Sequence, residues 1–254
     1  MHPEKRESNI VLGIRPIIEA IKAGKEVDKI LMQKNATGDL MGELKKLLAH
    51  NRIPIQFVPP EKLDLICQKN RLRSLSHQGV LAFVSAITYH DLSQVIPFVF
   101  EKSETPLVLV LDEITDVRNF GAIARTAECS GVHAIVIPKK GSAQINTDAV
   151  KTSAGALNHI PVCRVDSLKT TLQFLKESGL QVIACTEKAV DLIQKVDYTI
   201  PTAIVMGSEE SGISNDIIKT ADHLVKIPLF GKIASLNVSV ATGVILYEAI
   251  RQRG

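Results

Sequence analysis

The feature that most constrains the fold is a run of five apolar residues at 107–111, which is followed by similar short runs along the rest of the chain. A strand that is apolar at every position is typical of a parallel sheet, because such a strand is buried on both faces. The later runs lie at residues 134–137, 181–185, 203–206 and 224–227, with helical stretches between them. Alternating strands and helices predict an α/β fold for residues 106–254, with a parallel sheet and helices on both of its faces.

The first third of the chain indicates a second, smaller α/β unit. Helices are predicted where apolar residues recur three or four positions apart, and strands where short apolar runs lie between turn residues. The predicted helices span residues 13–23 and 39–50, and the predicted strands span residues 29–33, 53–58 and 79–85. The pattern weakens over residues 89–105, which we interpret as a linker. We therefore expect domains at residues 1–88 and 106–254.

Composition excludes several classes of protein. No apolar run approaches the roughly 20 residues that a membrane-spanning helix requires, and the N-terminus has no apolar signal core, so we expect a cytoplasmic protein. The four cysteines form no C-x-x-C pair and the seven histidines show no ligand spacing. These patterns argue against a disulfide framework and against a metal site.

Positive charge is concentrated near the N-terminus. Residues 1–90 contain 14 Lys and Arg against 9 Asp and Glu, a balance of +5, whereas residues 91–254 contain 16 against 18, a balance of −2. Part of the excess lies in residues 69–73. This distribution favours binding to nucleic-acid phosphates, although an ordinary solvated basic surface would give the same balance.

Loops that follow the predicted strands carry the candidate site residues, because ligands of open parallel sheets bind beyond the carboxyl ends of the strands. Asn119 and Arg125 follow the first strand, in a helix that we expect Asn119 to cap and Gly131 to end. Thr186 follows a later strand. The loop at residues 207–212 carries Glu209 between two glycines, and it matches neither G-x-G-x-x-G nor a P-loop.

The last of these loops, residues 228–237, leads into the C-terminal helix. We expect Ser235 to cap that helix. Its apolar stripe should consist of Leu236, Val240, Val244 and Tyr247. Few charges occur on any face, so the helix should be largely buried. Such a helix behind a polar, glycine-containing loop is suited to wrapping a small ligand and to meeting a second subunit.

Three segments, at residues 119–127, 206–212 and 227–241, resemble the three ordered motifs of the SpoU/TrmH family. This family comprises S-adenosylmethionine-dependent RNA 2′-O-ribose methyltransferases of the SPOUT superfamily. The resemblance covers about residues 105–254 and implies a C-terminal trefoil knot, which is a rare topology, and a homodimer. Residues 1–88 resemble, more loosely, the L30e-like RNA-binding domain of many members, and residues 76–80 are similar to the corresponding stretch of the two-domain rRNA enzymes.

The resemblance also implies roles for individual residues. Arg125 would activate the ribose hydroxyl, helped by Asn119, Glu209, Ser235 and Asn237. The cofactor would be held near Gly207, Ile227, Pro228 and Leu236, with Thr186 nearby. A guanidinium stays protonated in proteins, so we interpret Arg125 as a phosphate clamp and polariser and leave the proton acceptor open.

The predicted function is methyl transfer from S-adenosylmethionine to a ribose 2′-hydroxyl, the group that distinguishes RNA from DNA. The two-domain arrangement most resembles enzymes that methylate a guanosine of large-subunit (23S) rRNA, with tRNA left open as a substrate. One alternative is a non-enzymatic RNA-binding scaffold, which the intact motifs disfavour. Another is a dinucleotide-dependent enzyme, which the missing G-x-G-x-x-G disfavours.

Overall fold

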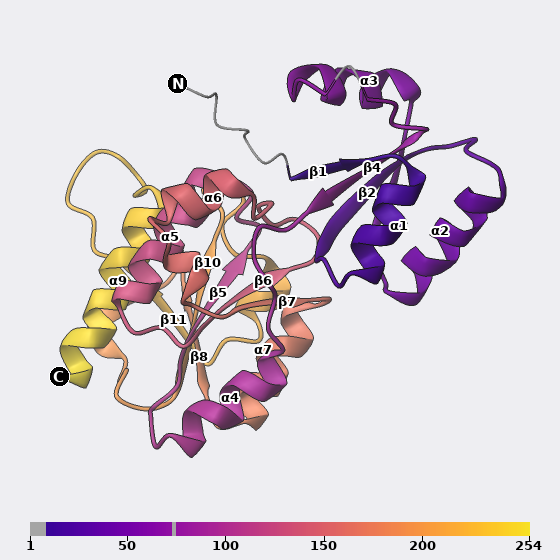
Figure 1. Ribbon diagram of the computed structural model, residues 1–254. Helices are drawn as coiled ribbons and strands as arrows, with labels where there is room; N and C mark the ends of the chain where they lie inside the picture. The colour runs from indigo at the N-terminus through magenta and orange to yellow at the C-terminus, as the bar shows by residue number, and fades with distance from the viewer. Residues whose placement is uncertain (1–8, 73–74) are drawn as a thin grey trace, which may run out of the picture. The chain divides into compact units, whose positions relative to one another are not determined.

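The computed structural model describes residues 9–72 and 75–254, which form parts of two compact units, Met1–Thr88 and Tyr89–Gly254 (Figure 1). Each unit contains its own sheet and its own hydrophobic core. Among the residues described, none of the helices is both long enough and apolar enough to cross a membrane.

The first unit is a four-stranded sheet with the strand order β1-β4-β2-β3. Strand β2 pairs in parallel with β3 and antiparallel with β4, which also pairs antiparallel with β1. Its elements are β1 (Ile10–Leu12), α1 (Ile14–Lys22), β2 (Val27–Gln33), α2 (Asp39–His50), β3 (Ile55–Val58), α3 (Pro60–Lys69) and β4 (Val80–Val84). The predicted α/β character is confirmed, but β1 and α3 were not anticipated. Strand β1 has only three residues, and α3 has few apolar residues and begins with a proline, which sequence patterns associate with loops.

The stretch before β4 ties distant parts of this unit together. The side chain of Gln78 accepts a hydrogen bond from the backbone N–H of Ile14 (3.0 Å), so it satisfies one of the free N–H groups at the start of α1. His77 accepts from the N–H of Gly79 (2.9 Å) through Nδ1 and contacts Asp64 of α3 (3.1 Å) through Nε2. These contacts give residues 76–80 a structural role. Arg73, part of the basic stretch at residues 69–73, lies outside the described residues.

The second unit is built on a seven-stranded sheet with the order β7-β6-β5-β10-β8-β11-β9. Every pairing in it is parallel, as predicted. Its strands are β5 (Leu107–Asp112), β6 (Ala134–Pro138), β7 (Val162–Val165), β8 (Gln181–Cys185), β9 (Asp191–Leu192), β10 (Thr202–Gly207) and β11 (His223–Lys226). Its α-helices are α4 (Leu92–Glu101), α5 (Val117–Cys129), α6 (Thr147–Thr152), α7 (Leu168–Glu177), α8 (Asn215–Ile218) and α9 (Val238–Arg253).

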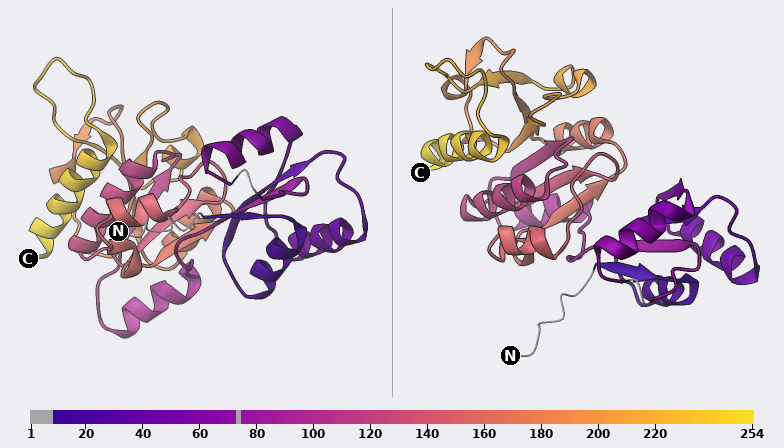
Figure 2. Two further views of the ribbon diagram at one scale, coloured as in Figure 1. Left: turned by 45° about the horizontal axis from the view of Figure 1, so that its top comes forward. Right: turned by 90° about the horizontal axis from the view of Figure 1, so that it is seen from above.

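Helices cover both faces of this sheet, as expected for a doubly covered parallel sheet. Helices α4, α7 and α8 contribute buried residues to one core, which also contains Val108, Val136 and Val205 from the strands. Helices α5, α6 and α9 lie together on the other face (Figures 1 and 2). Helices α4 and α9, the first and last α-helices of this unit, therefore lie on opposite faces of the sheet.

The segment at residues 89–105, interpreted above as a linker, contains helix α4. Asp91 caps this helix by accepting a hydrogen bond from the N–H of Ser93 (2.9 Å), and Leu92 and Ile96 are buried in the core of the second unit. The helix was missed because Pro97 lies inside it and polar residues flank it, and both features are typical of loops. Residues 89–105 are thus part of the second unit.

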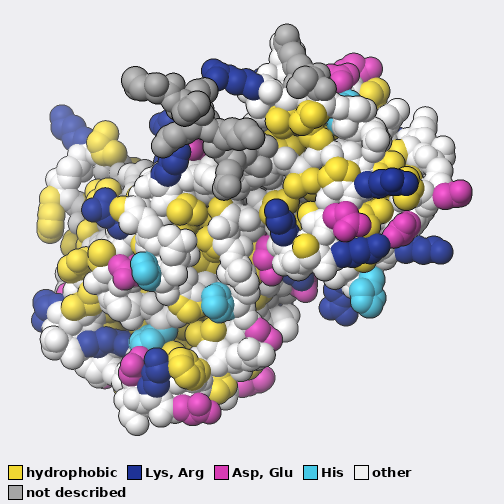
Figure 3. Space-filling model, viewed as in Figure 1, with side chains coloured by type: hydrophobic (Ala, Val, Ile, Leu, Met, Phe, Trp, Pro, Cys, Tyr) yellow, Lys and Arg dark blue, Asp and Glu magenta, His cyan; other side chains and the backbone are white. Residues whose placement is uncertain are grey.

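Helix α9 differs from the expectation in two respects. Its N-cap is Asn237, whose side chain accepts from the N–H of Ser239 (3.0 Å), and not Ser235. The expected apolar stripe is the exposed side of the helix, with Tyr247 56% exposed, while Ile245, Leu246 and Ala249 face the core. Figure 3 shows hydrophobic side chains at the surface along the edge where α9 lies. The apolar spacing was correctly recognised, but the helix has two apolar sides and only one of them is buried within the chain.

Candidate active site

The carboxyl ends of three neighbouring strands form the floor of the candidate site. Strand β8 lies between β10 and β11, and Cys185 is in register with both Met206 and Val225. Thr186, Gly207 and Ile227, which follow or end these strands, therefore meet at one edge of the sheet. Thr186 is only 5% exposed, and its N–H donates to the carbonyl of Val225 (2.8 Å).

The loop Gly207–Gly212 after β10 is unusually tight. Ser208 and Gly212 exchange two backbone hydrogen bonds of 3.1 and 3.0 Å, which closes the loop. A Cβ atom on Gly207 would lie 2.2 Å from the backbone carbon of Gly212, so no other residue fits at position 207 without moving the chain. The closure presents Glu209 at the tip of the loop.

Glu209 connects three loops that are far apart in the sequence. Its Oε1 atom accepts hydrogen bonds from Asn237 Nδ2 (2.6 Å) and Asn119 Nδ2 (3.2 Å). It also accepts from the backbone N–H of Val238 (3.1 Å), the first residue of α9. Asn237 Nδ2 donates a further bond to Asn119 Oδ1 (3.1 Å). The structure thus joins Asn119, Glu209 and Asn237 in one hydrogen-bonded cluster.

The caps of the two helices explain why these amide side chains are available. Asp116, and not Asn119, is the N-cap of α5, and its carboxylate accepts from the N–H of Asn119 (2.7 Å). Asn119 is consequently the third residue of the helix, where its side chain is free to reach Glu209. Asn237 uses its oxygen to cap α9 and its nitrogen to join the cluster. Each helix N-terminus is therefore satisfied by a short polar residue, as helix starts require.

Arg125 and Ser235 lie outside this cluster. Within the part of the chain that the structure describes, both are exposed and neither side chain makes a hydrogen bond or an ion pair. Arg125 is six residues after Asn119, which places it on a different side of α5 at about 100° per residue. Its neighbour Thr126 faces α9, since a Cβ atom on Gly243 would lie 3.7 Å from the Thr126 Cγ2 atom. Arg125 therefore lies close to the contact between α5 and α9.

The segment between β11 and α9 provides binding groups of a different kind. Figures 1 and 2 show it as a long loop that swings out before α9 begins. Across residues 228–236, all of which the structure describes, no hydrogen bond to another described residue is formed. Phe230 is 97% exposed and Ile233 78% exposed, and Leu236 is also exposed. Free backbone donors and acceptors beside apolar side chains are the groups that can hold the edges and faces of a purine ring, so this loop fits an adenine-containing cofactor.

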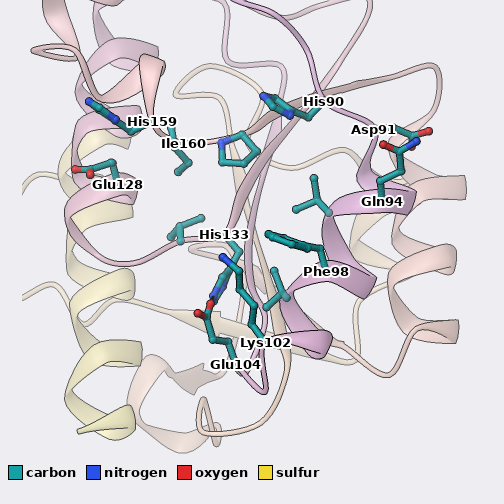
Figure 4. A pocket seen from close by; sticks show the side chains of 14 residues that line it. His90, Asp91, Gln94, Phe98, Lys102, Glu104, Glu128, His133, His159 and Ile160 are labelled. Atoms are coloured by element: carbon teal, nitrogen blue, oxygen red, sulfur yellow. Dashed lines mark hydrogen bonds and ion pairs between the residues drawn. The ribbon is translucent and has the colours of Figure 1, made fainter.

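Two cavities in the second unit lie at opposite edges of the sheet. The smaller one, about 340 Å³, is lined mainly by the loops after β5 and β10 and includes Asn119, Glu209 and Val238. The expected cofactor residues Thr186, Ile227 and Leu236 are not among its lining residues. The larger one, about 610 Å³, lies between α4 and the residues that precede β6 and β7 (Figure 4). Its lining residues come before the strands begin, so it lies at the amino ends of the strands.

Several polar groups of the larger cavity have local partners. His133 contacts Glu104 (3.0 Å) through Nε2 and accepts from the N–H of Leu107 (3.0 Å) through Nδ1. Lys102 lies over the ring of Phe98, 4.4 Å from its centroid. Size alone therefore does not identify the site, because the smaller cavity is the one where loops distant in sequence converge.

Two further observations concern the side chains that could bind a metal ion or act as a nucleophile. Among the described residues, no cluster of three or more His, Cys, Asp or Glu side chains is arranged to hold a metal ion. Burial raises the pKa of the thiols of Cys163 and Cys185 to about 12, with a smaller contribution from nearby carboxylates. Both thiols are therefore protonated at neutral pH, and a protonated thiol is a poor nucleophile.

Sequence reasoning missed four residues that shape this site, namely Glu113, Asp116, Ser208 and Ser211. Asp116 could have been identified from the sequence, because an Asp directly before the first residue of a helix is a frequent N-cap. The other three have no comparable signal, since their partners lie about a hundred residues away or across a tight turn.

Comparison with known proteins is consistent with this geometry. Residues 106–247 match the SpoU rRNA methylase family, and residues 10–90 match a family described as RNA 2′-O ribose methyltransferase substrate binding. A Bacillus subtilis protein assigned to the TrmH family of tRNA/rRNA methyltransferases is 37% identical over 98% of this chain and 97% of its own length.

Two solved structures extend the comparison. The SpoU methyltransferase AviRb from Streptomyces viridochromogenes, solved in complex with the cofactor AdoMet, has a TM-score of 0.60 and 26% identity, covering 96% of this chain and 90% of that one. The A. aeolicus TrmH/SpoU tRNA modifying enzyme has a TM-score of 0.54 and 35% identity, covering 64% of this chain and 84% of its own.

Proposed function

The chain belongs to the SpoU/TrmH family of RNA methyltransferases, and on that basis we propose that it transfers a methyl group from S-adenosylmethionine to a ribose 2′-hydroxyl of a guanosine in 23S rRNA. The observation that carries the proposal is the cluster in which Glu209 accepts hydrogen bonds from Asn119, Asn237 and Val238. It brings together all three segments whose sequence resembles the family's motifs.

The loops at the carboxyl edge supply the groups that a methyl donor needs. Gly207, Ile227 and Thr186 end or follow adjacent strands, and the backbone groups of residues 228–236 are free to bond an adenine. When bound, S-adenosylmethionine supplies an electrophilic methyl group, whose bond to sulfur breaks as the bond to the ribose oxygen forms while the hydroxyl proton passes to water or a phosphate. The apolar side chains of Leu236 and Pro228 would help to exclude water from this region.

We assign Arg125 the role of holding the phosphate beside the reacting ribose and polarising its hydroxyl. Its guanidinium makes no ion pair with any described residue, so it is available for an external anion. Asn119, Glu209 and Asn237 keep the starts of α5 and α9 in fixed positions around the reacting groups, which lowers the entropy cost of bringing donor and acceptor into line. Ser235, exposed beside this edge, is assigned to contact the substrate.

The exposed side of α9 supports a homodimer. Val240, Val244 and Tyr247 are exposed at helical spacing, and apolar patches larger than a monomer normally exposes mark interaction sites. Because Arg125 lies near the contact between α5 and α9, a second copy that covers α9 would also approach Arg125. Val244→Glu should therefore yield a monomer in sedimentation velocity, while Leu65→Glu, a matched change at an exposed apolar position of α3, should remain dimeric. A Val244→Glu protein that stays dimeric would refute this interface.

The family's trefoil knot is a further proposal for this chain. It rests on the family to which the chain belongs; the bond from the first residue of α9 to Glu209 places the start of this helix at the loop after β10. Threading of the C-terminus would make refolding slow. A folded domain fused after Gly254 should slow refolding from denaturant much more than the same domain fused at the N-terminus, and equal rates would argue against a knot.

We assign RNA selection to the first unit, in keeping with its charge balance of +5 over residues 1–90. Its sheet and cores are its own, so residues 89–254 should fold without it. A protein lacking residues 1–88 should bind S-adenosylmethionine normally and bind RNA more weakly. Unchanged RNA affinity and unchanged choice of site would refute this role.

The decisive test of function is methyl transfer from labelled S-adenosylmethionine to unmodified total RNA, with the product mapped by primer extension sensitive to 2′-O-methylation. A single stop at a guanosine of large-subunit rRNA is expected. A stop in tRNA would keep the chemistry and change the substrate, and a base-methylated product would contradict the proposed reaction.

A further inference from the structure

Glu113, the residue directly after β5, has a backbone conformation that glutamate rarely adopts. Its φ angle is +56°, in the left-handed region. That region is unfavourable for a residue with a Cβ, whereas glycine enters it freely. A strained residue of this kind justifies a search for a function of its side chain.

The side chain of Glu113 holds the loop Gly207–Gly212. Its Oε2 accepts a hydrogen bond from the hydroxyl of Ser211 (2.8 Å), which lies 98 residues later in the chain. The hydroxyl of Ser211 has one proton and gives it to Glu113, so the 2.7 Å contact between Ser208 and Ser211 must be donated by Ser208. The N–H of Ser211 completes this series of hydrogen bonds by donating to the Ser208 oxygen (3.1 Å).

Different partners therefore fix the two sides of this one loop. Glu209 bonds to the starts of α5 and α9, while Ser211 bonds to Glu113, directly after β5, and Ser208 bonds to Ser211. The neighbour of Glu113 adds to the second attachment, because the buried carboxylate of Asp112 accepts from the N–H of Ser214 (2.8 Å). Ser208 directly follows Gly207, where the methyl donor is proposed to bind.

We propose that Glu113 is a positioning residue for the methyl donor: through Ser211 and Ser208, its carboxylate holds the part of the loop that forms the wall of the cofactor site. This inference rests on the proposed function. Since the contacts of Glu209 do not depend on Glu113, loss of Glu113 should weaken donor binding and leave the chemical step nearly intact.

Glycine and glutamine are the informative substitutions. Glu113→Gly removes the side chain and also relieves the backbone strain, so a loss of function could not be attributed to a less stable fold. Glu113→Gln keeps an oxygen that can accept from Ser211 and should behave like the unmodified protein. Ser103→Gly is the matched control, because Ser103 also has a left-handed backbone (φ +59°) and follows α4, away from these loops.

The test compares steady-state methylation, thermal unfolding and hydrogen exchange of the ligand-free loop in these variants. For Glu113→Gly we expect the KM for S-adenosylmethionine to rise about fivefold, as for loss of one hydrogen bond. The kcat should stay within about twofold, exchange at residues 207–213 should be faster, and the Tm should not fall. Glu113→Gln should restore both KM and exchange, and Ser103→Gly should change neither.

Several outcomes would overturn the inference. An unchanged KM and unchanged exchange in Glu113→Gly would show that the carboxylate does not hold the loop, and failure of Glu113→Gln to restore them would show that the hydrogen bond is not the cause. If the unmodified protein did not bind S-adenosylmethionine at all, the proposed function and the donor role would fall together. A protein that binds the donor equally well with and without Glu113 would refute only this inference.

Discussion

The two edges of the seven-stranded sheet are stabilised in different ways. At the amino edge, backbone carbonyls are bonded by long side chains of the same unit. Arg253, at the end of α9, donates to the carbonyls of Tyr198 and Thr105 (both 2.8 Å) and of Pro106 and Ile200 (both 3.1 Å). At the carboxyl edge, side chains from distant loops bond to one another, and residues 228–236 keep their backbone groups free.

This contrast indicates which edge is structural and which is functional. The amino edge holds the larger cavity, where His133 and Glu104 are used in local contacts. The carboxyl edge holds the smaller cavity, where a single carboxylate oxygen of Glu209 organises three loops. Substitutions at the carboxyl edge should therefore impair activity, and substitutions at the amino edge should impair stability.

The largest effect is expected at Arg125. Arg125→Ala should lower the rate of methyl transfer by about a thousandfold or more, because it removes the charge that we propose to hold the phosphate and polarise the ribose hydroxyl. Binding of S-adenosylmethionine, measured by calorimetry, should be largely preserved, since the Arg125 side chain makes no hydrogen bond or ion pair with any described residue of the loops at the carboxyl ends of β8, β10 and β11. Near-normal methylation by this variant would remove Arg125 from the mechanism.

The next largest effect concerns Glu209. Glu209→Ala should reduce kcat by about a hundredfold, because Asn119, Asn237 and the first N–H of α9 lose their common acceptor. Phe98→Ala, in the larger cavity, provides the comparison at the other edge and should leave kcat unchanged. If the Phe98 variant lost more activity than the Glu209 variant, the assignment of the two edges would be reversed.

Substitutions at Arg253 test whether the amino edge of the sheet contributes to stability. Arg253→Ala should lower the free energy of unfolding by about 2–3 kcal/mol, because four carbonyls at the starts of β5 and β10 lose a charged donor. Urea unfolding would measure this loss, and the KM for S-adenosylmethionine should not change. Arg253→Lys keeps the charge but not the planar fork, so it should recover only part of the stability.

The smallest expected effect is a difference in the rates at which the cysteine thiols react with a reagent. Cys129 is exposed, whereas burial raises the pKa of Cys163 and Cys185 to about 12. In the folded protein at pH 8, a disulfide reagent should therefore modify Cys129 rapidly and the other two only after unfolding. Rapid modification of Cys185 would mean that the carboxyl edge opens more readily than the structure suggests.

Much of the fold could be predicted from the sequence because its signals are local. Continuous apolar runs identified buried strands such as β5 and β10, and the alternation with helices predicted the parallel sheet. The elements that were missed have weak local signals, as α4 has with its internal Pro97. Tertiary burial of Leu92 and Ile96 stabilises this helix, and no local pattern reveals that contact.

The site shows the same division between local and long-range information. The motif segments identified Asn119, Glu209 and Asn237 as candidates, but spacing could not show that one oxygen of Glu209 accepts from both amides. The roles of Asn119 and Ser235 as caps were predicted incorrectly, because Asp116 and Asn237 occupy those positions. The apolar stripe of α9 was identified, but its exposure could not be foreseen, since both sides of the helix are apolar and spacing does not show which of them the chain buries.

The most direct test of the assignment is hydrogen exchange of the complete protein with and without S-adenosylmethionine. The account predicts that the donor slows exchange at residues 207–212 and 228–238 and leaves residues 90–104 and 159–161, around the larger cavity, unchanged. Protection confined to residues 90–104 and 159–161 would contradict the account, because the cofactor would then bind at the amino edge of the sheet.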